Sequence, residues 1–570
     1  MKNFTLIKIM FYSIYIFSVS YVQCTFTTKP NVVIVLIDNH SYFELSRNGH
    51  KIVETPRIDR LAEEGVTFKN FYAPPFCSPS RTELLTGRYA LRAGVHNTIG
   101  GVSILHKNEK TIAKILKKAG YRTGVFGKWH LGNTYPYAPK YRGFDEVFIH
   151  GGGGVSQLED YYGNSHMDAT FEHNGQYVKS RGFSTDVLFD QGIDFIGRNR
   201  ENPFFCFIST PAVHFPTLKH PENTKRLLAR GVPDSKHLAI YSMIENVDDN
   251  VGRLLDYLDE IDLKENTLFI LASDQGVNDR GAFMHRAGEF IERGVQYDEK
   301  HQVYCMIQYP QLTNKNRRLI DELAGMVDIT PTILDICNVK MSESLDGLSL
   351  KPLLAGSKKW DIERKLIIQC PRKRERNKWE NVSIKYQNWR FVDGKELYDV
   401  KKDRGQLVNI IKDHPDLVTK LRKSYETFWT SLEPAKELIP VHILGSIEAP
   451  AVRLNGMDWY SGDAPWHQGN LNENFHQGKW LVDIERDGHY SFELRRYPRE
   501  ASKAIGATSA AIQIGNPKVQ TSLDPLDKKA ILQMELKKGQ YDLQTFFKDD
   551  SNPIEESNWG AYYVYVNYLQ

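Results

Sequence analysis

Apolar runs alternate with amphipathic segments along the first two thirds of the chain. Residues 31–37 (NVVIVLI) form a continuous, largely β-branched run, which predicts a strand buried on both faces of a parallel sheet. Thr55 and Pro56 form a helix-start signal, and apolar residues follow at helical spacing. The longest helical stripe, residues 240–258, leads into a second apolar run at 267–272. This alternation predicts an α/β fold with a large, mainly parallel sheet flanked by helices.

Two aspartates stand where these apolar runs end. Asp38 follows the first run, and Asp274 follows the second after one serine. Ligands of parallel sheets bind beyond the carboxyl ends of the strands, so both residues are candidates for a site. An aspartate in this position is also a common helix cap, and that alternative stays open at this stage.

The pattern changes after about residue 355. Short alternating segments between residues 367 and 400, with the turn signal Asp393-Gly394, predict a small antiparallel sheet, and a helix is expected near residues 415–432. Alternation before and after Asp487-Gly488 is typical of a hairpin and, with further alternating segments, predicts a separate C-terminal β-sandwich. The predicted divisions are an N-terminal segment at 1–24, an α/β domain at 25–355, a small antiparallel sheet plus helix at 356–437 and a β-sandwich at 438–570.

The N-terminal segment predicts export. Lys2 and Lys8 lead into an apolar, aromatic and hydroxyl run at residues 9–22, which is typical of a secretory signal peptide. The run is slightly shorter than the roughly 20 residues that cross a bilayer, so an uncleaved anchor is an alternative. Lipidation of Cys24 after cleavage is another, and it would tether the protein to a membrane. We expect a periplasmic or secreted protein, either free or membrane-tethered through Cys24.

Composition excludes several classes. The 570 residues are 41% hydrophobic and 25% charged, which is ordinary for a globular protein of two or three domains. The net charge of +3 comes without a long basic run, so no nucleic-acid partner is indicated. The six cysteines form no CxxC pair, which argues against a zinc framework, and Cys206 and Cys305 lie in apolar runs typical of a core. The oligomeric state is not set by these features.

The most specific segment is CSPSRTELLTGR, which starts at Cys77. Pro79 suits the first turn of a helix, so Cys77 is expected just before a helix N-terminus, where free N–H groups favour an anion. Arg81 adds a cation. This combination is typical of a nucleophile beside an anion site, although an ordinary structural helix start is the alternative.

This segment resembles the hallmark of the formylglycine-dependent sulfatases of the alkaline phosphatase superfamily: Cys or Ser, any residue, Pro, any residue, Arg, then TGR. Six further pieces recur in the family's order between residues 30 and 430: NVVIVLID, TPRIDRLAEEGVTFKNFYA, GYRTGVFGKWHLG, AVHFP, ASDQG and ELYDV. The resemblance implies an alkaline phosphatase-like fold and hydrolysis of sulfuric esters. It also implies that a formylglycine-generating enzyme oxidises Cys77 to an aldehyde, whose hydrate attacks sulfur.

The family holds a divalent cation, usually Ca²⁺, between two pairs of oxygen ligands beside the modified cysteine. In this chain the pairs are Asp38 with Asn39 and Asp274 with Gln275, and the modified Cys77 is expected as a further metal ligand. Carboxylate and amide oxygens suit Ca²⁺, and Mg²⁺ stays an alternative. The family usually has a second aspartate where Asn39 stands, and often Asn or His where Gln275 stands, so this site carries less negative charge than the usual pattern.

Four further residues stand at family positions that act on the sulfate group, and three of them match the family residue. Lys128 and His130 match residues that contact the sulfate and handle the protons of the hydrate, and His214 matches a histidine on the leaving-group side. Arg293 stands where the family has a lysine. Arginine can bind sulfate oxygens but cannot donate a proton, so protonation of the departing alcohol is expected to fall mainly to His214.

Export and sulfate-ester chemistry together suggest a sulfated carbohydrate substrate, of the polysaccharide or glycosaminoglycan type. Hydrolysis of phosphonate or phosphate esters by the same site is an alternative, and a non-catalytic sulfated-glycan-binding protein is another. Aromatic residues of the C-terminal segment suit core packing or sugar stacking: Trp459, Tyr460, Trp466, His467 and Trp480. Candidate specificity residues are His40, Asn97, His166 and Arg372.

Overall fold

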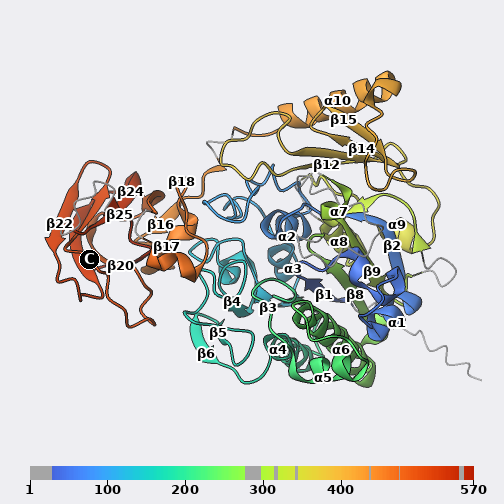
Figure 1. The fold of residues 1–570 in the computed structure, drawn as a ribbon, viewed down its shortest axis with the longest axis horizontal. Helices are drawn as coiled ribbons and strands as arrows, with labels where there is room; N and C mark the ends of the chain where they lie inside the picture. Colours follow the sequence, from blue (N-terminus) through green and yellow to red (C-terminus); the bar gives the residue numbers. More distant parts are fainter. Residues whose placement is uncertain are drawn as a thin grey trace, which may run out of the picture.

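A large mixed sheet forms the centre of the molecule in the computed structural model, which describes residues 29–276, 297–313, 319–340, 344–434, 438–473, 476–550 and 558–570 (Figure 1). Its strands are β1 (Asn31–Ile37), β2 (Val66–Tyr72), β3 (Arg122–Lys128), β4 (Glu146–His150), β5 (Thr170–His173), β6 (Gln176–Lys179), β7 (Phe204–Ser209), β8 (Thr267–Ser273), β9 (Gln302–Gln308), β10 (Leu319–Ile320) and β11 (Ala324–Gly325). They lie in the order β10-β2-β9-β8-β1-β7-β3-β4-β5-β6, with β11 beside β2. The run from β8 to β4 is parallel, as predicted.

Helices cover both faces of this sheet. The helices are α1 (Pro56–Glu64), α2 (Cys77–Thr86), α3 (Ile112–Lys118), α4 (Ser184–Arg198), α5 (Pro221–Ala229), α6 (Leu238–Glu260), α7 (Asp298–His301), α8 (Ile329–Ile336), α9 (Lys351–Leu354) and α10 (Pro415–Thr430). Side chains of β1 alternate between two hydrophobic cores: Val32, Ile34 and Leu36 pack with α2, α3 and α8, whereas Val33, Val35 and Ile37 pack with α1, α4 and α6. All seven residues of β1 are buried, which explains its unbroken apolar sequence.

A small antiparallel sheet follows the large one along the chain. It contains β12 (Lys365–Gln369), β13 (Val382–Tyr386), β14 (Trp389–Val392) and β15 (Glu396–Asp399). Apolar residues of this sheet, such as Ile384 and Phe391, pack against Leu421 and Tyr425 of α10. The predicted small sheet and its helix are therefore confirmed.

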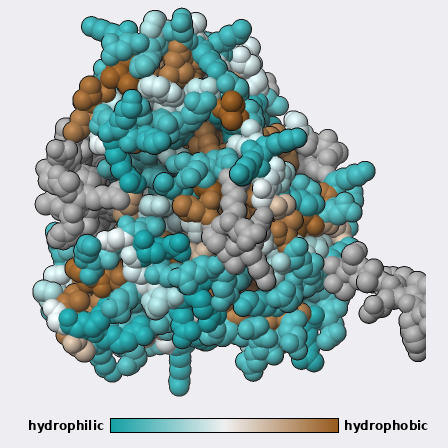
Figure 2. Space-filling model, turned by 90° about the vertical axis from the view of Figure 1, so that its right-hand side faces the viewer, coloured by the Kyte–Doolittle hydropathy of each residue, from teal (hydrophilic) through white to brown (hydrophobic). Residues whose placement is uncertain are grey.

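On the face seen in Figure 2, hydrophobic side chains form small separate patches among hydrophilic ones, as is usual for a water-facing surface.

The C-terminal part is a β-sandwich beside the β4–β6 side of the large sheet (Figure 1). One sheet contains β16 (His442–Leu444), β18 (Ser461–Gly462), β19 (Gly478–Ile484), β21 (Ser509–Ile514), β22 (Lys518–Ser522), β24 (Gly539–Lys548) and β25 (Asn558–Trp559). The other contains β17 (Ala451–Asn455), β20 (Gly488–Arg495), β23 (Ala530–Leu536) and β26 (Tyr563–Tyr568). Fully buried side chains from both sheets, including Trp480, Phe492, Leu543 and Val564, form the core between them. The predicted sandwich is confirmed.

The predicted hairpin around Asp487-Gly488 is wrong. β19 pairs with β16 and β24 in one sheet, whereas β20 pairs with β23 and β26 in the other. Both strands alternate because each has one face on the common core. Alternation and a turn signal look the same for a hairpin and for a connection between two sheets, so the sequence alone could not separate them.

The segment between β4 and β5 joins the large-sheet part to the sandwich. Leu158 is fully buried in the sandwich's core, and its carbonyl accepts a hydrogen bond of 2.7 Å from the Tyr563 hydroxyl. Glu159 Oε1 accepts one of 3.0 Å from the side-chain amide of Asn455, which also donates to Asp458 at 2.9 Å. The sandwich is thus attached through buried polar and apolar contacts.

This junction predicts a pH-dependent stability. Burial raises the pKa of Glu159 from its ordinary 4.5 to about 7, although Arg453 opposes the shift. A raised folded-state pKa gives a stabilising contribution that is complete below pH 4.5 and is lost as the pH rises to 7. The loss is on the order of a few kcal/mol. Glu159→Gln keeps an acceptor oxygen without the charge, so its free energy of unfolding should rise relative to wild type between pH 4.5 and 7. Denaturant titrations at several pH values measure the free energy of unfolding of both proteins. A difference between variant and wild type that does not change with pH would contradict this prediction.

The predicted signal segment, residues 1–24 with Cys24, lies outside the described residues. In the part of the chain that the structure describes, no helix is both long and apolar enough to cross a membrane. The domain boundaries at residues 355 and 437 stay predictions.

Candidate active site

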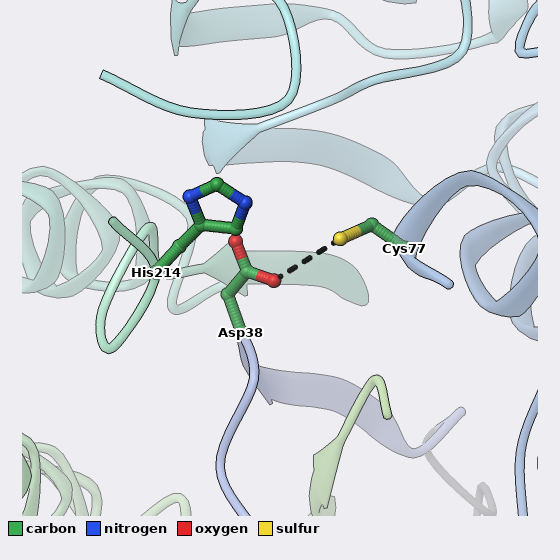
Figure 3. A group of neighbouring side chains, drawn as sticks. All are labelled: Asp38, Cys77 and His214. Atoms are coloured by element: carbon green, nitrogen blue, oxygen red, sulfur yellow. Dashed lines mark hydrogen bonds between the residues drawn. The ribbon is translucent and has the colours of Figure 1, made fainter. Parts of the chain in front are cut away.

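The ends of two parallel strands and the start of one helix meet at a single point. Ile37 of β1 is in register with Ser273 of β8, so Asp38 and Asp274 follow at the same edge of the sheet. The two turns are linked by a hydrogen bond of 3.0 Å from the Asn39 backbone N–H to Asp274 Oδ1. Figure 3 shows Cys77, at the start of α2, directed toward Asp38, with His214 beside that carboxylate. The predicted convergence of residues 38, 77 and 274 is therefore present.

Cys77 is buried, with 3% of its surface exposed, and its Sγ lies 3.4 Å from Asp38 Oδ1. The helix starts at Cys77 itself, with Phe76 at the N-cap position, so the cysteine lies one residue further into the helix than predicted. Burial, and then the negative charge of Asp38, raises the pKa of the Cys77 thiol. Because the thiolate is the reactive form, an unmodified thiol here would be a weak nucleophile at neutral pH.

Two cations are paired with the two aspartates. Lys128 Nζ donates to Asp38 Oδ2 at 2.6 Å, and Arg81 donates to Asp274 Oδ2 at 3.0 Å, and all four side chains are fully buried. Burial is the largest influence on the Lys128 ammonium group and lowers its pKa, but the acidic groups around it, Asp38 first and then Cys77 and Asp274, together outweigh burial and raise that pKa. These fixed positive charges beside Cys77 suit an anionic group.

Arg81 is further oriented by contacts outside this pair. Its guanidinium donates to the Lys128 carbonyl at 2.9 Å and to the hydroxyl of Ser209 at the end of β7. Sequence reasoning missed Ser209, because a serine ending a buried strand has no distinctive signal.

The four predicted oxygen ligands fit a divalent cation. Asp38, Asn39, Asp274 and Gln275 are all buried. Burial, together with repulsion from Asp38, raises the pKa of Asp274 to about 6, although Arg81 opposes the shift. Added positive charge at this point would therefore reduce the repulsion between the two carboxylates. The Gln275 amide nitrogen contacts Asn39 Oδ1, and Gln275 Oε1 is buried without a hydrogen-bond partner among the described residues. Hard oxygen donors of this kind suit Ca²⁺ or Mg²⁺.

Both predicted histidines lie at this site. His130 Nε2 lies 3.0 Å from the Thr98 carbonyl. A carbonyl only accepts, so Nε2 carries the hydrogen and Nδ1 keeps its lone pair. Burial, Lys128 and Arg81 hold the pKa of His130 well below its ordinary value, so the ring is neutral at neutral pH. His214 is half-buried, offers a ligand atom within 4.8 Å of those of Asp38 and Cys77, and has Nδ1 2.5 Å from the Phe215 carbonyl.

A glycine loop, residues 151–154, closes against these rings and was missed by sequence reasoning. A Cβ atom on Gly153 would lie 2.1 Å from His130 Cε1, and one on Gly154 would lie 2.9 Å from His214 Nδ1. Only glycine fits at Gly153 without displacing the ring. The signal was visible in the sequence as four consecutive glycines.

The remaining predicted residues differ in their placement. Arg293 lies outside the described residues. His40 Nδ1 contacts the Tyr304 hydroxyl at 2.7 Å, and His166 Nδ1 contacts that of Ser184 at 2.8 Å, so these buried histidines have structural contacts. The Arg372 guanidinium lies 4.8 Å from the ring of Phe76, the residue before Cys77, and its carbonyl accepts from Asn97 at 3.3 Å.

The aromatic residues of the sandwich differ in how deeply they are buried. Trp459 and Trp480 are buried in its core, as core packing requires. Trp466 is 49% exposed.

The family model "Sulfatase" matches residues 30–339, more than half of the chain, and "N-sulphoglucosamine sulphohydrolase, C-terminal" matches residues 288–429. An N-acetylglucosamine-6-O-sulfatase of Bacteroides thetaiotaomicron is 26% identical, over 67% of this chain and 83% of the relative. The human N-acetylgalactosamine-6-sulfatase is 27% identical, over 58% and 67%.

Solved structures agree with the fold. The structure described as Ps i-CgsB in complex with k-i-k-neocarrahexaose has a TM-score of 0.62 and 25% identity, covering 71% of this chain and 94% of that one. BT4656 in complex with D-glucosamine-2-N,6-O-disulfate has a TM-score of 0.56 and 22% identity, covering 70% and 99%.

Proposed function

The chain belongs to the sulfatase family and is a sulfuric ester hydrolase, and from that premise we propose that it removes sulfate from a sulfated carbohydrate by means of an oxidised Cys77. The observation that carries the proposal is the buried group of Asp38, Cys77, Arg81, Lys128 and Asp274, in which the thiol contacts Asp38 and two fixed cations pair with the two aspartates.

The proposed nucleophile comes from Cys77. Oxidation to formylglycine supplies an aldehyde whose hydrate offers one hydroxyl to attack sulfur and a second whose deprotonation later expels sulfate and restores the aldehyde. A formylglycine-generating enzyme is the implied partner for maturation.

The surrounding side chains take the roles that their contacts suit. Arg81 and Lys128 stabilise the charge on the sulfate oxygens, because both are held by buried aspartates. Neutral His130, with Nδ1 free of a hydrogen atom, removes the proton from the second hydroxyl. Arg293 is proposed as a further sulfate contact on the family resemblance alone.

Asp38, Asn39, Asp274 and Gln275 would hold the divalent cation beside residue 77, and we propose Ca²⁺, with Mg²⁺ as the alternative. When bound, the ion supplies Lewis-acid polarisation of the sulfate oxygens. The chain's own contribution is to hold the four oxygen donors in a buried pocket.

A sulfated glycan is the proposed substrate class. Support comes from relatives named as N-acetylglucosamine-6-O-sulfatase and N-acetylgalactosamine-6-sulfatase, and from Ps i-CgsB in complex with a neocarrahexaose. The exported location expected from residues 1–24 fits extracellular or periplasmic polysaccharide degradation.

The test compares a sulfate ester and a phosphate ester of the same phenol, followed by sulfated oligosaccharides with defined sulfate positions. A higher kcat/KM for the sulfate ester and release of sulfate from at least one oligosaccharide support the proposal. Preference for the phosphate ester would favour the alternative of a phosphonate or phosphate ester hydrolase, and binding of glycans without turnover would favour the non-catalytic one.

His214 gives a prediction about the leaving group. If His214 protonates the departing alcohol, His214→Ala should lower kcat/KM by about 10²- to 10⁴-fold for alkyl and sugar sulfates, which leave poorly. The loss should be much smaller for activated aryl sulfates, whose phenolate leaves without a proton. A Brønsted plot of rate against leaving-group pKa measures the difference. Equal losses for both classes would count against this role.

A further inference from the structure

The residues that follow the glycine loop are held by the sandwich. We define the docking segment as residues 155–164. Within it, residue 157 forms an isolated antiparallel β-bridge with His467 of the sandwich. The Leu158 N–H donates to the Trp466 carbonyl at 3.3 Å, and the Gln468 N–H donates to the Ser156 carbonyl at 3.0 Å. A short piece of sheet therefore joins the sandwich to the chain immediately after the loop that touches both histidines.

Two glutamine side chains extend this connection. The side-chain amide of Gln468 donates to the Gln157 carbonyl at 3.1 Å, and its Oε1 accepts from the Gly163 N–H at 3.0 Å. Gln157 Oε1 in turn accepts from the Gly153 N–H at 2.7 Å. Gln157 is buried, so an unmade hydrogen bond there has no water to replace it.

The final contact is between the glycine loop and the histidines. Because a Cβ on Gly153 would overlap the His130 ring, the loop backbone must lie directly against that ring. The backbone at Gly154 lies near the ring of His214 in the same way. Displacement of this loop would thus remove one wall from both rings.

We propose that the C-terminal sandwich completes the active site, with Gln468 and Gln157 as positioning residues that hold the glycine loop against His130 and His214. This rests on the proposed function, since both histidines act there on protons. Holding two proton-transfer groups in place affects the chemical step more than ground-state binding.

The test uses glutamine-to-methionine changes in the full-length protein, which keep side-chain length while removing the amide. Gln157→Met and Gln468→Met should each lower kcat by about 10- to 100-fold, with KM for an aryl sulfate unchanged within about twofold. Gln513→Met is the matched control, because it removes an amide-to-carbonyl bond of 3.0 Å elsewhere in the sandwich. Gln157→Glu keeps the acceptor oxygen for Gly153 and should restore most of the lost kcat.

Gly153→Ala addresses the last contact directly. The added methyl group must displace the His130 ring, so kcat should fall by about 100-fold or more with bound metal and Tm retained. Gly405→Ala is the control, because a Cβ there meets only the Leu407 side chain at 3.3 Å or more.

Wild-type kcat in both methionine variants would overturn the proposal, as would equal losses in Gln513→Met. If the wild type hydrolyses only the phosphate ester, the proposed function fails and the same comparison is made on that ester. If it hydrolyses neither, crystal structures of the variants decide: an unmoved glycine loop and unmoved histidine rings would overturn the positioning role, and displaced ones would support it.

Discussion

Cys77→Ala is expected to lower sulfate-ester hydrolysis by at least about 10⁴-fold while the protein stays folded. The alanine cannot form the aldehyde, and the remaining cations can only bind the substrate. Cys206→Ala, a change at a buried thiol of β7, should keep its activity because that thiol belongs to the core. Activity is measured as kcat/KM on an aryl sulfate, and folding by thermal unfolding, for the wild type and for both variants.

The same residue allows a chemical test. Peptide mass analysis of active protein should find residue 77 as formylglycine rather than cysteine. Full activity in protein whose Cys77 is entirely an unmodified thiol would contradict the mechanism, and so would a Cys77→Ala variant that keeps wild-type turnover.

On aryl sulfates, Asp274→Asn is expected to have the second largest effect. The change keeps the shape of the side chain but removes one of two negative charges at the cation site and the charged partner of Arg81. We expect kcat to fall by about 10³-fold or more. Added Ca²⁺ should raise the Tm of the wild type, because a ligand that binds only the folded state stabilises it, and should leave the Tm of the variant unchanged.

Calorimetric titration with Ca²⁺ and Mg²⁺ after chelator treatment measures the same loss directly. Asp335→Asn is the control, because Asp335 is a partly exposed residue paired with Lys351 and should leave metal binding intact. Equal Ca²⁺ affinity in Asp274→Asn and wild type would show that the ion lies elsewhere.

The parts of this protein that could be predicted are those specified locally. A strand buried on both faces must be apolar throughout, so residues 31–37 and 267–272 were visible, and strand ends in a parallel sheet placed Asp38 and Asp274 together. The short motif around Cys77 added the third member. These predictions needed only the chain's own periodicity and a family resemblance.

The parts that could not be predicted depend on contacts between distant segments. Ser209 and the glycine loop act through Arg81 and His130, which lie far from them in the sequence. The prediction of a hairpin at Asp487-Gly488 failed for a related reason. Alternation along a strand shows that one face is buried but does not show which strand pairs with it. Nothing in the alternation of the last 130 residues indicated their attachment to the loop after β4.

The insertion of Leu158 into the sandwich has a consequence for protein engineering. A C-terminal module cut out at residue 437 would lack one fully buried member of its own core, and the shortened enzyme would expose that same leucine to water. Exchanging such modules between related enzymes should therefore succeed only if residues 155–164 are transferred with the sandwich. The two parts are separate in architecture but are not interchangeable units.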